Sequence, residues 1–293
     1  MYISVRGEHY LQKTFGSLKA GLDAMDLDNV ELEYFRDKTV LSLDGSNGTT
    51  ESLATESDVD VFLRHCSELG CKVTALLLHN NFAAEDVDAE LDWVISCIKT
   101  ADRIGVKAVR IDAIMSTELE WPLEKRVQRF TDCMGKILDA TSDCNVDMGI
   151  ENHGVKGNEP EFLDMVLGKV GSPRLGVTID IANFYWYGHP LSKVHEIIEH
   201  FASRVKHTHI KNIHYPAQMR EIQRELGYEY GTYVSPLRDG DIDIPRVVQT
   251  LKNAGYKGDL CIEDESVIRW DVEKCKEVLV DDAVYMREIL KKL

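Results

Sequence analysis

Residues 72–105 read KVTALLLHNNFAAEDVDAELDWVISCIKTADRIG, a short apolar strand pattern followed by a longer helical pattern. Lys72–His79 is almost continuously apolar, which is typical of a strand buried on both faces of a sheet. Val87–Ile104 carries apolar residues at helical spacing and ends at Gly105, a residue that favours helix ends. This stretch therefore predicts one strand–helix unit of a parallel sheet.

The same unit recurs on both sides of this stretch. The other predicted strands are Tyr2–Arg6, Val30–Phe35, Lys107–Ile111, Asn145–Glu151, Leu175–Asp180, Val205–Ile210 and Asp259–Glu263. The other predicted helices are Lys13–Met25, Glu56–Leu69, Leu123–Ala140, Pro160–Leu167, Leu191–Ala202, Ile244–Ala254 and Val272–Leu290. Eight units without a linker predict one α/β domain over residues 1–293, a closed (β/α)8 TIM barrel, whose typical length is about 250 residues.

An open, doubly wound sheet is the alternative fold. That fold usually carries a glycine-rich turn after its first strand. Here the turn is Arg6-Gly7-Glu8-His9, which has a single glycine. The sequence therefore favours the barrel.

Composition restricts the function and the compartment. The net charge is −16 and the acidic residues are spread along the chain, so a nucleic-acid partner is not expected. The seven cysteines form no Cys-x-x-Cys pair, which favours reduced core thiols in a cytosolic protein. The chain shows neither a signal-peptide pattern nor an apolar run of membrane-spanning length, so we expect a cytoplasmic protein without a membrane partner.

Four ligand-type side chains end the last four predicted strands: Glu151, Asp180, His209 and Glu263. The carboxyl ends of barrel strands surround one pocket, so these groups are expected to meet there. Three partly desolvated carboxylates would repel one another, and a cation removes that repulsion. Three oxygen ligands and one imidazole suit Mn²⁺ best, with Mg²⁺, Co²⁺ and Zn²⁺ as alternatives. Taken alone, a carboxylate at a strand end is as readily an N-cap of the next helix.

Other side chains are expected around the same pocket. Lys211 is placed to support a developing oxyanion, or else is a solvated lysine. His153 is expected to contact substrate at the pocket rim, and His79 and Asn81 either bind hydroxyl groups or cap the following helix. Trp186 belongs to an aromatic cluster that gives sugars an apolar wall, or else forms loop core. Arg110 and Asp112 end the fourth strand, where an internal ion pair is expected.

A long interval, residues 214–240, separates the seventh strand from its helix. Its length exceeds an ordinary barrel connection, and loops at this face of a barrel carry function. We therefore expect an inserted lid, with a short helix at Ala217–Leu226 and several tyrosines after it. A surface excursion or a subunit contact is the alternative, and a homo- or hetero-oligomer stays open.

Several segments together resemble the xylose-isomerase-like superfamily of TIM-barrel sugar isomerases and epimerases, including ketose 3-epimerases. They are Glu151–Gly154, Asp180–Asn183, His207–Lys211 and Gly255–Glu263, with a partial match at Arg238–Asp243, where Arg238 replaces a family glycine. The similarity covers essentially the whole chain. It is specific to the superfamily and not to one reaction.

The resemblance implies roles for particular residues. The family's metal ligands fall on Glu151, Asp180, His209 and Glu263, and His207 would face either the substrate or the ligand shell. In the ketose 3-epimerases of this superfamily, two glutamates bind metal and also move protons on opposite faces of the sugar. The same double role is implied for Glu151 and Glu263.

The leading hypothesis is a divalent-metal-dependent isomerase or epimerase of a sugar or keto-sugar. It would abstract a proton next to a carbonyl, through an enediolate that the metal stabilises. The alternative is a lyase or dehydratase, for example one that cleaves a C- or O-glycoside of a 3-keto-sugar by the same enolate chemistry. The expected substrate is a neutral sugar, because no glycine-rich phosphate cradle follows the last two strands.

Two further classes fit the sequence less well. The superfamily's DNA-repair endonucleases need a histidine-rich three-metal cluster and a basic surface, whereas this chain has one set of four ligands and a net charge of −16. In a sugar-binding barrel without catalysis, Lys211 and the two pocket histidines would have no chemical role.

Overall fold

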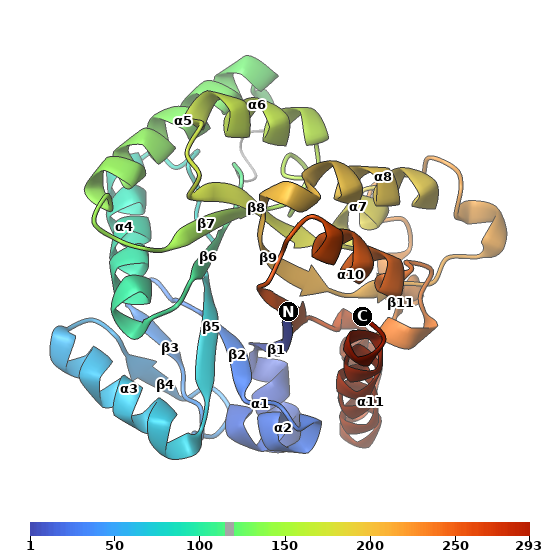
Figure 1. The fold of residues 1–293 in the computed structure, drawn as a ribbon, viewed down its shortest axis with the longest axis horizontal. Helices are drawn as coiled ribbons and strands as arrows, with labels where there is room; N and C mark the ends of the chain where they lie inside the picture. The colour runs from blue at the N-terminus through green and yellow to red at the C-terminus, as the bar shows by residue number, and fades with distance from the viewer. Residues whose placement is uncertain (115–119) are drawn as a thin grey trace.

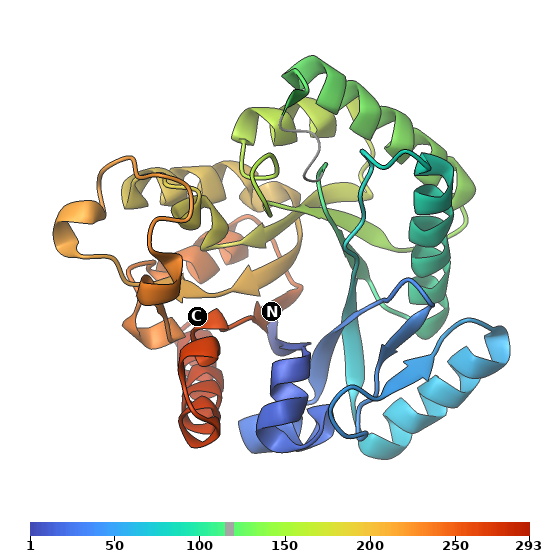
Figure 2. The same ribbon diagram turned by 180° about the vertical axis from the view of Figure 1, so that it is seen from behind.

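Eight parallel strands close into a barrel in the part of the chain that the computed structural model describes, residues 1–114 and 120–293. The strand order is β1-β12-β9-β8-β7-β6-β5-β2, and every neighbouring pair is parallel. Helices surround the strands on the outside (Figures 1 and 2). The closed order confirms the predicted (β/α)8 barrel over the open sheet.

The bounds of most elements lie close to those predicted. The barrel strands are β1 (Tyr2–Gly7), β2 (Asn29–Glu33), β5 (Lys72–Leu77), β6 (Ala108–Ile111), β7 (Asp147–Glu151), β8 (Leu175–Asp180), β9 (Val205–Ile210) and β12 (Asp259–Ile262). The outer helices are α1 (His9–Phe15), α2 (Leu18–Met25), α3 (Glu56–Leu69), α4 (Val87–Ile104), α5 (Leu123–Ala140), α6 (Pro160–Val170), α8 (Leu191–Phe201), α10 (Ile244–Asn253) and α11 (Val272–Lys291).

The helix ends show why the predicted bounds of α3 and α4 were right. Thr55 and Asp58 form a reciprocal capping box at the start of α3, and the Asp86 side chain accepts from the Ala89 N–H at the start of α4. Gly70 and Gly105 end these helices in the left-handed conformation, at φ 66° and 79°. Local capping chemistry therefore fixes both helices independently of the barrel.

The predicted helix over Lys13–Met25 is wrong, because the structure has two helices there. Gly16 lies at φ 94°, which ends α1, and Ser17 then caps α2 by accepting from the Ala20 N–H at 3.1 Å. Gly16 and Ser17 carry the end signal and the start signal side by side, but the apolar periodicity continues through both residues.

A small hairpin between β2 and α3 was not predicted. Its strands are β3 (Thr39–Leu41) and β4 (Thr50–Ser52), which pair antiparallel. His65 of α3 contacts this hairpin region through Glu51 (2.8 Å) and Asp44 (3.2 Å). Strands of three residues are too short for alternation of apolar and polar side chains to reveal them.

The segment between β9 and α10 is closed by a short antiparallel pair, β10 (Asn212–Ile213) with β11 (Val234–Ser235). The helix expected at Ala217–Leu226 is wrong: the structure has only a 3-10 turn, η3 (Ala217–Met219), and a short helix α9 (Tyr230–Tyr233) follows later.

Arg224 explains how the middle of this segment folds without a helix. Its buried guanidinium donates to main-chain oxygens of Tyr185, His189 and Met219 at 2.6–2.9 Å, and it lies 4.3 and 4.5 Å from the ring centroids of Tyr185 and Tyr215. A single arginine thus ties the middle of this segment to residues 185 and 189 and to its own first turn.

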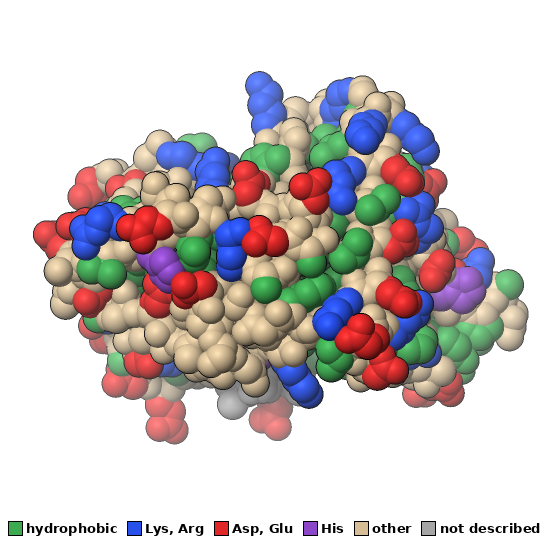
Figure 3. All heavy atoms as spheres, turned by 90° about the horizontal axis from the view of Figure 1, so that it is seen from below, with side chains coloured by type: hydrophobic (Ala, Val, Ile, Leu, Met, Phe, Trp, Pro, Cys, Tyr) green, Lys and Arg blue, Asp and Glu red, His purple; other side chains and the backbone are tan. Residues whose placement is uncertain are grey.

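Burial and surface charge agree with the composition. All seven cysteines are buried and free, as expected for core thiols. On the face shown in Figure 3, acidic and basic side chains are intermixed and do not gather into one basic surface. Among the described residues, no helix combines the length and apolarity needed to cross a membrane.

Candidate metal centre

The four ligand-type residues predicted from the sequence converge at one end of the barrel. Glu151 and Asp180 are the last residues of β7 and β8, His209 lies in β9, and Glu263 directly follows β12. One potential ligand atom from each lies within 4.8 Å of the others, and all four residues are buried. Parallel neighbouring strands bring residues that are far apart in sequence to the same level. The group could hold a divalent metal ion.

The imidazole of His209 shows which of its nitrogens faces the group. Its Nδ1 atom lies 3.1 Å from Glu151 Oε1 and 3.2 Å from Glu263 Oε2. Its Nε2 atom lies 2.8 Å from Glu31 Oε2 on the opposite side of the ring. A carboxylate behind a histidine ligand fixes the ring orientation and makes the ligand more basic. Nδ1 is therefore the potential ligand atom.

Two oxygens of the group lack a hydrogen-bond partner among the described residues. They are Asp180 Oδ2 and Glu263 Oε2, both inaccessible to solvent. Lys211 Nζ lies 2.8 Å from the first and 3.7 Å from the second, which makes ion pairs but leaves both oxygens without a well-formed hydrogen bond. Buried oxygens in this state are unfavourable, and a metal ion would satisfy them. The residues present therefore fit a divalent cation with oxygen and imidazole ligands.

Three cationic side chains compensate the carboxylates from outside the group. Arg6 pairs with Glu263 and also with Glu8, whose Oε1 is 2.7 Å from Arg6 Nε. Arg110 pairs with Glu151, and Lys211 pairs with Asp180. Each carboxylate ligand thus has one buried or nearly buried basic partner, which lowers the free energy of holding three negative charges together.

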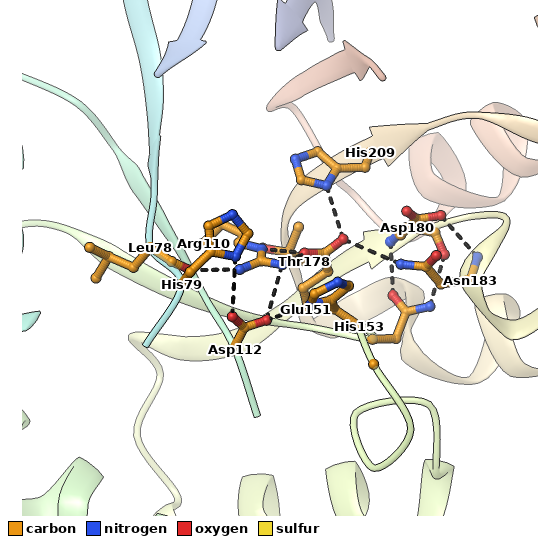
Figure 4. Close-up of polar contacts among 12 residues, drawn as sticks. Leu78, His79, Arg110, Asp112, Glu151, His153, Thr178, Asp180, Asn183 and His209 are labelled. Atoms are coloured by element: carbon orange, nitrogen blue, oxygen red, sulfur yellow. Dashed lines mark hydrogen bonds and ion pairs between the residues drawn. The ribbon is translucent and has the colours of Figure 1, made fainter. Parts of the chain in front are cut away.

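Arg110 also forms the ion pair that the sequence predicted. Its Nη2 atom lies 3.0 Å from Asp112 Oδ1, and only 2% of its side chain is exposed. Figure 4 shows Glu151 between this pair and Asp180. Asp112, Glu151 and His153 are close enough to bind a cation, but the guanidinium of Arg110 already bridges the two carboxylates.

Burial and neighbouring charges shift the carboxyl groups unequally. Burial raises the pKa of Asp180, and the negative charges of Glu263 and Glu151 raise it further. The pKa of Asp180 reaches about 7, although the Lys211 ammonium lowers it. For Glu263, burial opposes ionisation, but His209, Lys211 and Arg6 outweigh it and lower its pKa to about 2. The site therefore holds Asp180 as its least easily ionised carboxyl group, a state that a divalent cation would reverse.

A second buried layer supports His209 from within the barrel. Glu31 of β2 accepts from His209 through Oε2 and from His207 through Oε1, at 2.8 and 2.9 Å. His207 also contacts Asp259 at 2.9 Å, and Ser4 donates to Asp259 at 2.7 Å. Both nitrogens of His207 are thus engaged and the residue is fully buried. His207 thus lies in the buried layer behind His209, and its expected contact with substrate stays a prediction.

His153 and His79 stand at the rim, on the side of β5 and β6. His153 Nδ1 lies 2.8 Å from Asp112 Oδ1, and His79 Nδ1 lies 3.5 Å from Asp112 Oδ2. Their side chains are 37% and 42% exposed, so both can be reached from solvent. Asn81 is used differently: its side chain accepts from the Ala83 N–H at 3.0 Å and shapes the loop before α4.

A cavity of about 250 Å³ opens at this end of the barrel. It is lined by His153, Gly154, Asn183, Trp186, Lys211, Tyr230 and Glu265. His153, Trp186 and Lys211 were predicted around the pocket, whereas His79, Asn81 and His207 do not line this cavity. Its size is just below the roughly 300–1,000 Å³ of pockets for drug-sized ligands, so it could hold a small molecule.

Sequence reasoning missed several residues of the centre: Arg6, Glu31, Asp259, Tyr230 and Glu265. For Glu31 a signal was present, because the strands of a closed parallel barrel are buried on both faces, where a charged residue is rarely found unless it has a partner. Arg6 carries the same signal near the end of β1. Tyr230 and Glu265 lie in a four-residue helix and a five-residue 3-10 helix, which are too short for periodicity to indicate which way a side chain points.

Comparison with known proteins identifies the family to which this barrel belongs. The family model of the xylose isomerase-like TIM barrel matches residues 20–283. An uncharacterised protein of Methanocaldococcus jannaschii is 27% identical over 150 residues, which span 50% of this chain and 45% of that protein. The chain therefore matches less than half the length of that relative.

Three solved structures share the fold. A protein named IOLI, with a bound zinc atom, is 16% identical, with a TM-score of 0.72 over 100% of this chain and 99% of the other. An L-ribulose 3-epimerase is 14% identical (TM-score 0.69; 100% and 95% covered). A mannonate dehydratase from Streptococcus suis is 14% identical (TM-score 0.66; 99% and 93%). At such identities the likeness shows the fold alone, whereas the family match spans most of the sequence. The chain therefore belongs to the xylose isomerase-like TIM-barrel family.

Proposed function

We propose that this protein is a divalent-metal-dependent isomerase or epimerase that moves a proton beside the carbonyl group of a neutral sugar or keto-sugar. One observation carries the proposal. Glu151 and Glu263 come from strands separated by β8 and β9, yet both reach His209 Nδ1, at 3.1 and 3.2 Å. Two carboxylates that approach one point from different strands can remove a proton on one face of a carbon and return it on the other.

Glu151, Asp180, His209 and Glu263 would hold the metal, with Mn²⁺ preferred and Mg²⁺, Co²⁺ or Zn²⁺ as alternatives. When bound, the ion would act as a Lewis acid that polarises a carbonyl group. The fit rests on the buried oxygens of Asp180 and Glu263 that lack a well-formed hydrogen bond, and on the single imidazole. The zinc atom of one structural neighbour supports a divalent ion but not its identity.

The chain's own groups would complete the site. Lys211 Nζ is buried between Asp180 and Glu265, so its ammonium is positioned to stabilise negative charge that develops on a substrate oxygen. Asp112 fixes His153 through Nδ1, which leaves Nε2 for a substrate hydroxyl. Trp186 offers an aromatic wall for a sugar ring.

A neutral substrate agrees with the charges around the cavity. Lys211 is the single lysine or arginine among its described lining residues, and its ammonium is already paired with Asp180 and Glu265. A phosphate group would need donors that are free of carboxylates. We therefore expect the neutral sugar to be preferred over its phosphate ester.

Proton exchange tests the proposal directly. The Mn²⁺-loaded protein is incubated in D₂O with a panel of ketoses and 3-keto-glycosides, and deuterium at the α-carbon and the products are followed by NMR. We expect exchange together with an isomerised or epimerised product, and its loss in Glu151→Gln and Glu263→Gln. No exchange with any panel member would refute the proposed reaction.

The dehydratase or lyase alternative has its own support in His153. Elimination needs an acid for the leaving group in addition to the base that takes the α-proton. His153 lines the cavity and is held by Asp112, apart from the two glutamates. Release of water or an aglycone from the same panel, with deuterium incorporation, would favour this alternative.

We also infer that residues 214–240 act as a lid over bound substrate. Tyr230 from this segment lines the cavity, which supports a covering role. Arg224 anchors the first half to Tyr185 and His189, so the moving part is expected after residue 226. Loss of activity after shortening residues 227–233, with unchanged oligomer mass by light scattering, would separate a lid from a subunit contact.

A further inference from the structure

The stretch Gly227–Tyr233, which we call the clasp, contacts the cavity at two separate walls. Tyr230 of α9 reaches Glu265, which follows β12. Gly227 reaches Trp186, which ends α7 (Asn183–Trp186) beyond β8. Tyr230, Glu265 and Trp186 all line the cavity. A segment remote in sequence from the strand ends therefore helps to shape both sides of the mouth.

The Tyr230 contact leads toward the candidate metal centre through defined bonds. The Tyr230 hydroxyl donates to Glu265 Oε2 at 2.6 Å. Lys211 Nζ donates to Glu265 Oε1 at 2.8 Å and lies 2.8 Å from Asp180 Oδ2. Each oxygen of Glu265 thus has its own partner, and the carboxylate cannot rotate without breaking one of these bonds. Tyr230 fixes Glu265, and Glu265 fixes one side of the Lys211 ammonium.

The Gly227 contact requires glycine. Its φ of +66° is a conformation that side chains rarely adopt, and an added Cβ would come within 3.2 Å of Trp186 Nε1. Its N–H donates to the Trp186 main-chain oxygen at 2.9 Å. The clasp therefore packs closely against the indole ring of Trp186. Because Gly227 and Tyr230 are only three residues apart, the clasp also limits the distance between Trp186 and Tyr230.

Backbone conformation directly before Tyr230 is unusual. Glu229 has φ 40° and ψ 37°, a left-handed conformation that is unfavourable for a residue with a Cβ, and its side chain is exposed. Such conformations persist where surrounding contacts determine them, and they cluster at binding sites. In this structure Glu229 lies between Gly227 and Tyr230, both of which contact residues that line the cavity.

We propose that Tyr230 is a specificity-determining residue that the clasp contributes to the cavity, where its hydroxyl and the Glu265 carboxylate together recognise a hydroxyl group of a polyol substrate. The proposal rests on the proposed function, since it concerns the same cavity and a sugar-like ligand. Tyr230 oxygen can still accept a hydrogen bond while it donates to Glu265, and the Glu265 oxygens can accept from a sugar hydroxyl.

Hydrogen bonds from buried polar groups to a substrate hydroxyl discriminate strongly between sugars that have this hydroxyl and sugars that lack it. A site built to bond a substrate hydroxyl rejects the analogue that lacks it, because its buried polar groups are then left unpaired. Tyr230→Phe removes the hydroxyl and keeps the ring, so packing of the clasp is preserved. Tyr228→Phe is the matched control: Tyr228 lies in the same clasp and stacks with Tyr233 at 6.3 Å, but it does not line the cavity.

Calorimetry of binding to the Mn²⁺-loaded protein tests the proposal without needing turnover. The probes are ketopentoses, ketohexoses and their singly deoxygenated analogues, and metal content is measured for each variant. We expect one deoxygenation to weaken binding to the wild type by about 10- to 100-fold, the range for a hydrogen bond to a charged group. In Tyr230→Phe that discrimination should shrink to less than about threefold, whereas Tyr228→Phe should keep it.

The outcomes separate this proposal from the proposed reaction. A purely structural role for Tyr230 would weaken all sugars equally and leave the discrimination intact, which would overturn the proposal. Equal binding by wild type and Tyr230→Phe for every probe, including no binding at all, would overturn it too. If the wild type binds through Tyr230 but exchanges no α-proton, recognition by Tyr230 stands and the proposed reaction is wrong.

Discussion

Two sides of the barrel mouth share one arrangement, which we call the asparagine bracket: a buried asparagine side chain bonds the main-chain N–H and oxygen of an aspartate at a strand end. The two aspartates held in this way differ in their surroundings. On the side of β7 and β8, Asn152 bonds the main-chain N–H and oxygen of Asp180 at 2.8 and 2.9 Å. On the side of β5 and β6, Asn80 bonds the same two main-chain atoms of Asp112 at 2.8 and 3.2 Å. Both asparagines and both aspartates are fully buried.

The two aspartates differ in the net charge that surrounds them. Burial opposes ionisation of Asp112, but Arg110 and His153 outweigh it and hold its pKa well below the usual range. Burial raises the pKa of Asp180, and the neighbouring Glu263 and Glu151 raise it further. Arg110 thus completes an internal ion pair on one side, whereas on the other side Lys211 pairs with Asp180 but two further carboxylates lie close to it. Neighbouring charge, and not backbone position, decides which aspartate is available to a cation.

The largest effect is expected from removing the cation that the two sides share. Arg110→Met leaves Asp112 and Glu151 without their buried partner, which should lower the free energy of unfolding by about 3–5 kcal/mol. Mn²⁺ should restore part of this loss, since the ion would compensate Glu151. Urea unfolding with and without Mn²⁺ measures both effects. Arg103→Met, at an exposed surface pair with Asp60, is the control and should change the free energy of unfolding far less; equal losses in the two variants would contradict the assignment.

The next effect distinguishes the two aspartates by metal binding. Asp180→Asn removes a charged oxygen from the ligand group and should weaken metal affinity by about 100-fold or more. Asp112→Asn should change the affinity by less than about threefold, because Arg110 already occupies the space between Asp112 and Glu151. Chelator competition measures both. A similar loss in the two variants would break the comparison.

Support from within the barrel should have a smaller effect. Glu31→Gln replaces one acceptor of the two imidazoles with an amide donor, so His209 loses a fixed orientation. We expect metal affinity to fall by about 10- to 100-fold, the usual range for residues that orient a metal ligand. Glu33→Gln in the same strand is the control, since Glu33 approaches only His79, at 3.9 Å. Equal affinity in Glu31→Gln and the control would place Glu31 outside the support of the site.

The smallest effect on stability is expected outside the barrel mouth, at His65. Its partly exposed ion pair gives a reference against which the buried ion pairs can be compared. Its hydrogen bond to Glu51 raises the pKa of His65 above 6.5, and Asp44 adds to the rise. The stabilisation should therefore be fully present below pH 6.5 and disappear as pH rises through the raised value. Unfolding of wild type and His65→Gln across pH 5–9 should differ by less than about 1 kcal/mol. A difference that does not change with pH would argue against the ion pair.

The barrel and its four ligand-type residues were accessible from the sequence for one physical reason. Strand ends in a parallel barrel share one face, so Glu151, Asp180, His209 and Glu263 needed only correct strand assignment to be placed together. The helices α3 and α4 followed from capping residues that act locally. The clearest failure among the helices, at Gly16, arose because apolar periodicity continued across a helix end.

Side-chain partnerships were much less accessible. Arg110 was expected to pair with Asp112, and it does, but its second bond to Glu151 depends on the distance between β6 and β7. Glu31 contacts residues about 180 positions away, which no local pattern encodes. Tyr230 reaches Glu265 through a left-handed residue at Glu229, a conformation that propensity disfavours.

The asparagine bracket has a consequence for how such a barrel can change over time. Asn80 and Asn152 bond only main-chain atoms of the residues at positions 112 and 180, so they hold the strand ends in place whichever side chain stands there. A mutation at either position can alter the chemistry of the mouth while the spacing of the strands is retained. The position of the two strand ends is thus set separately from the chemistry that they carry, although the Asp180 side chain also accepts from the Ala182 and Asn183 N–H groups and therefore has a local structural role of its own.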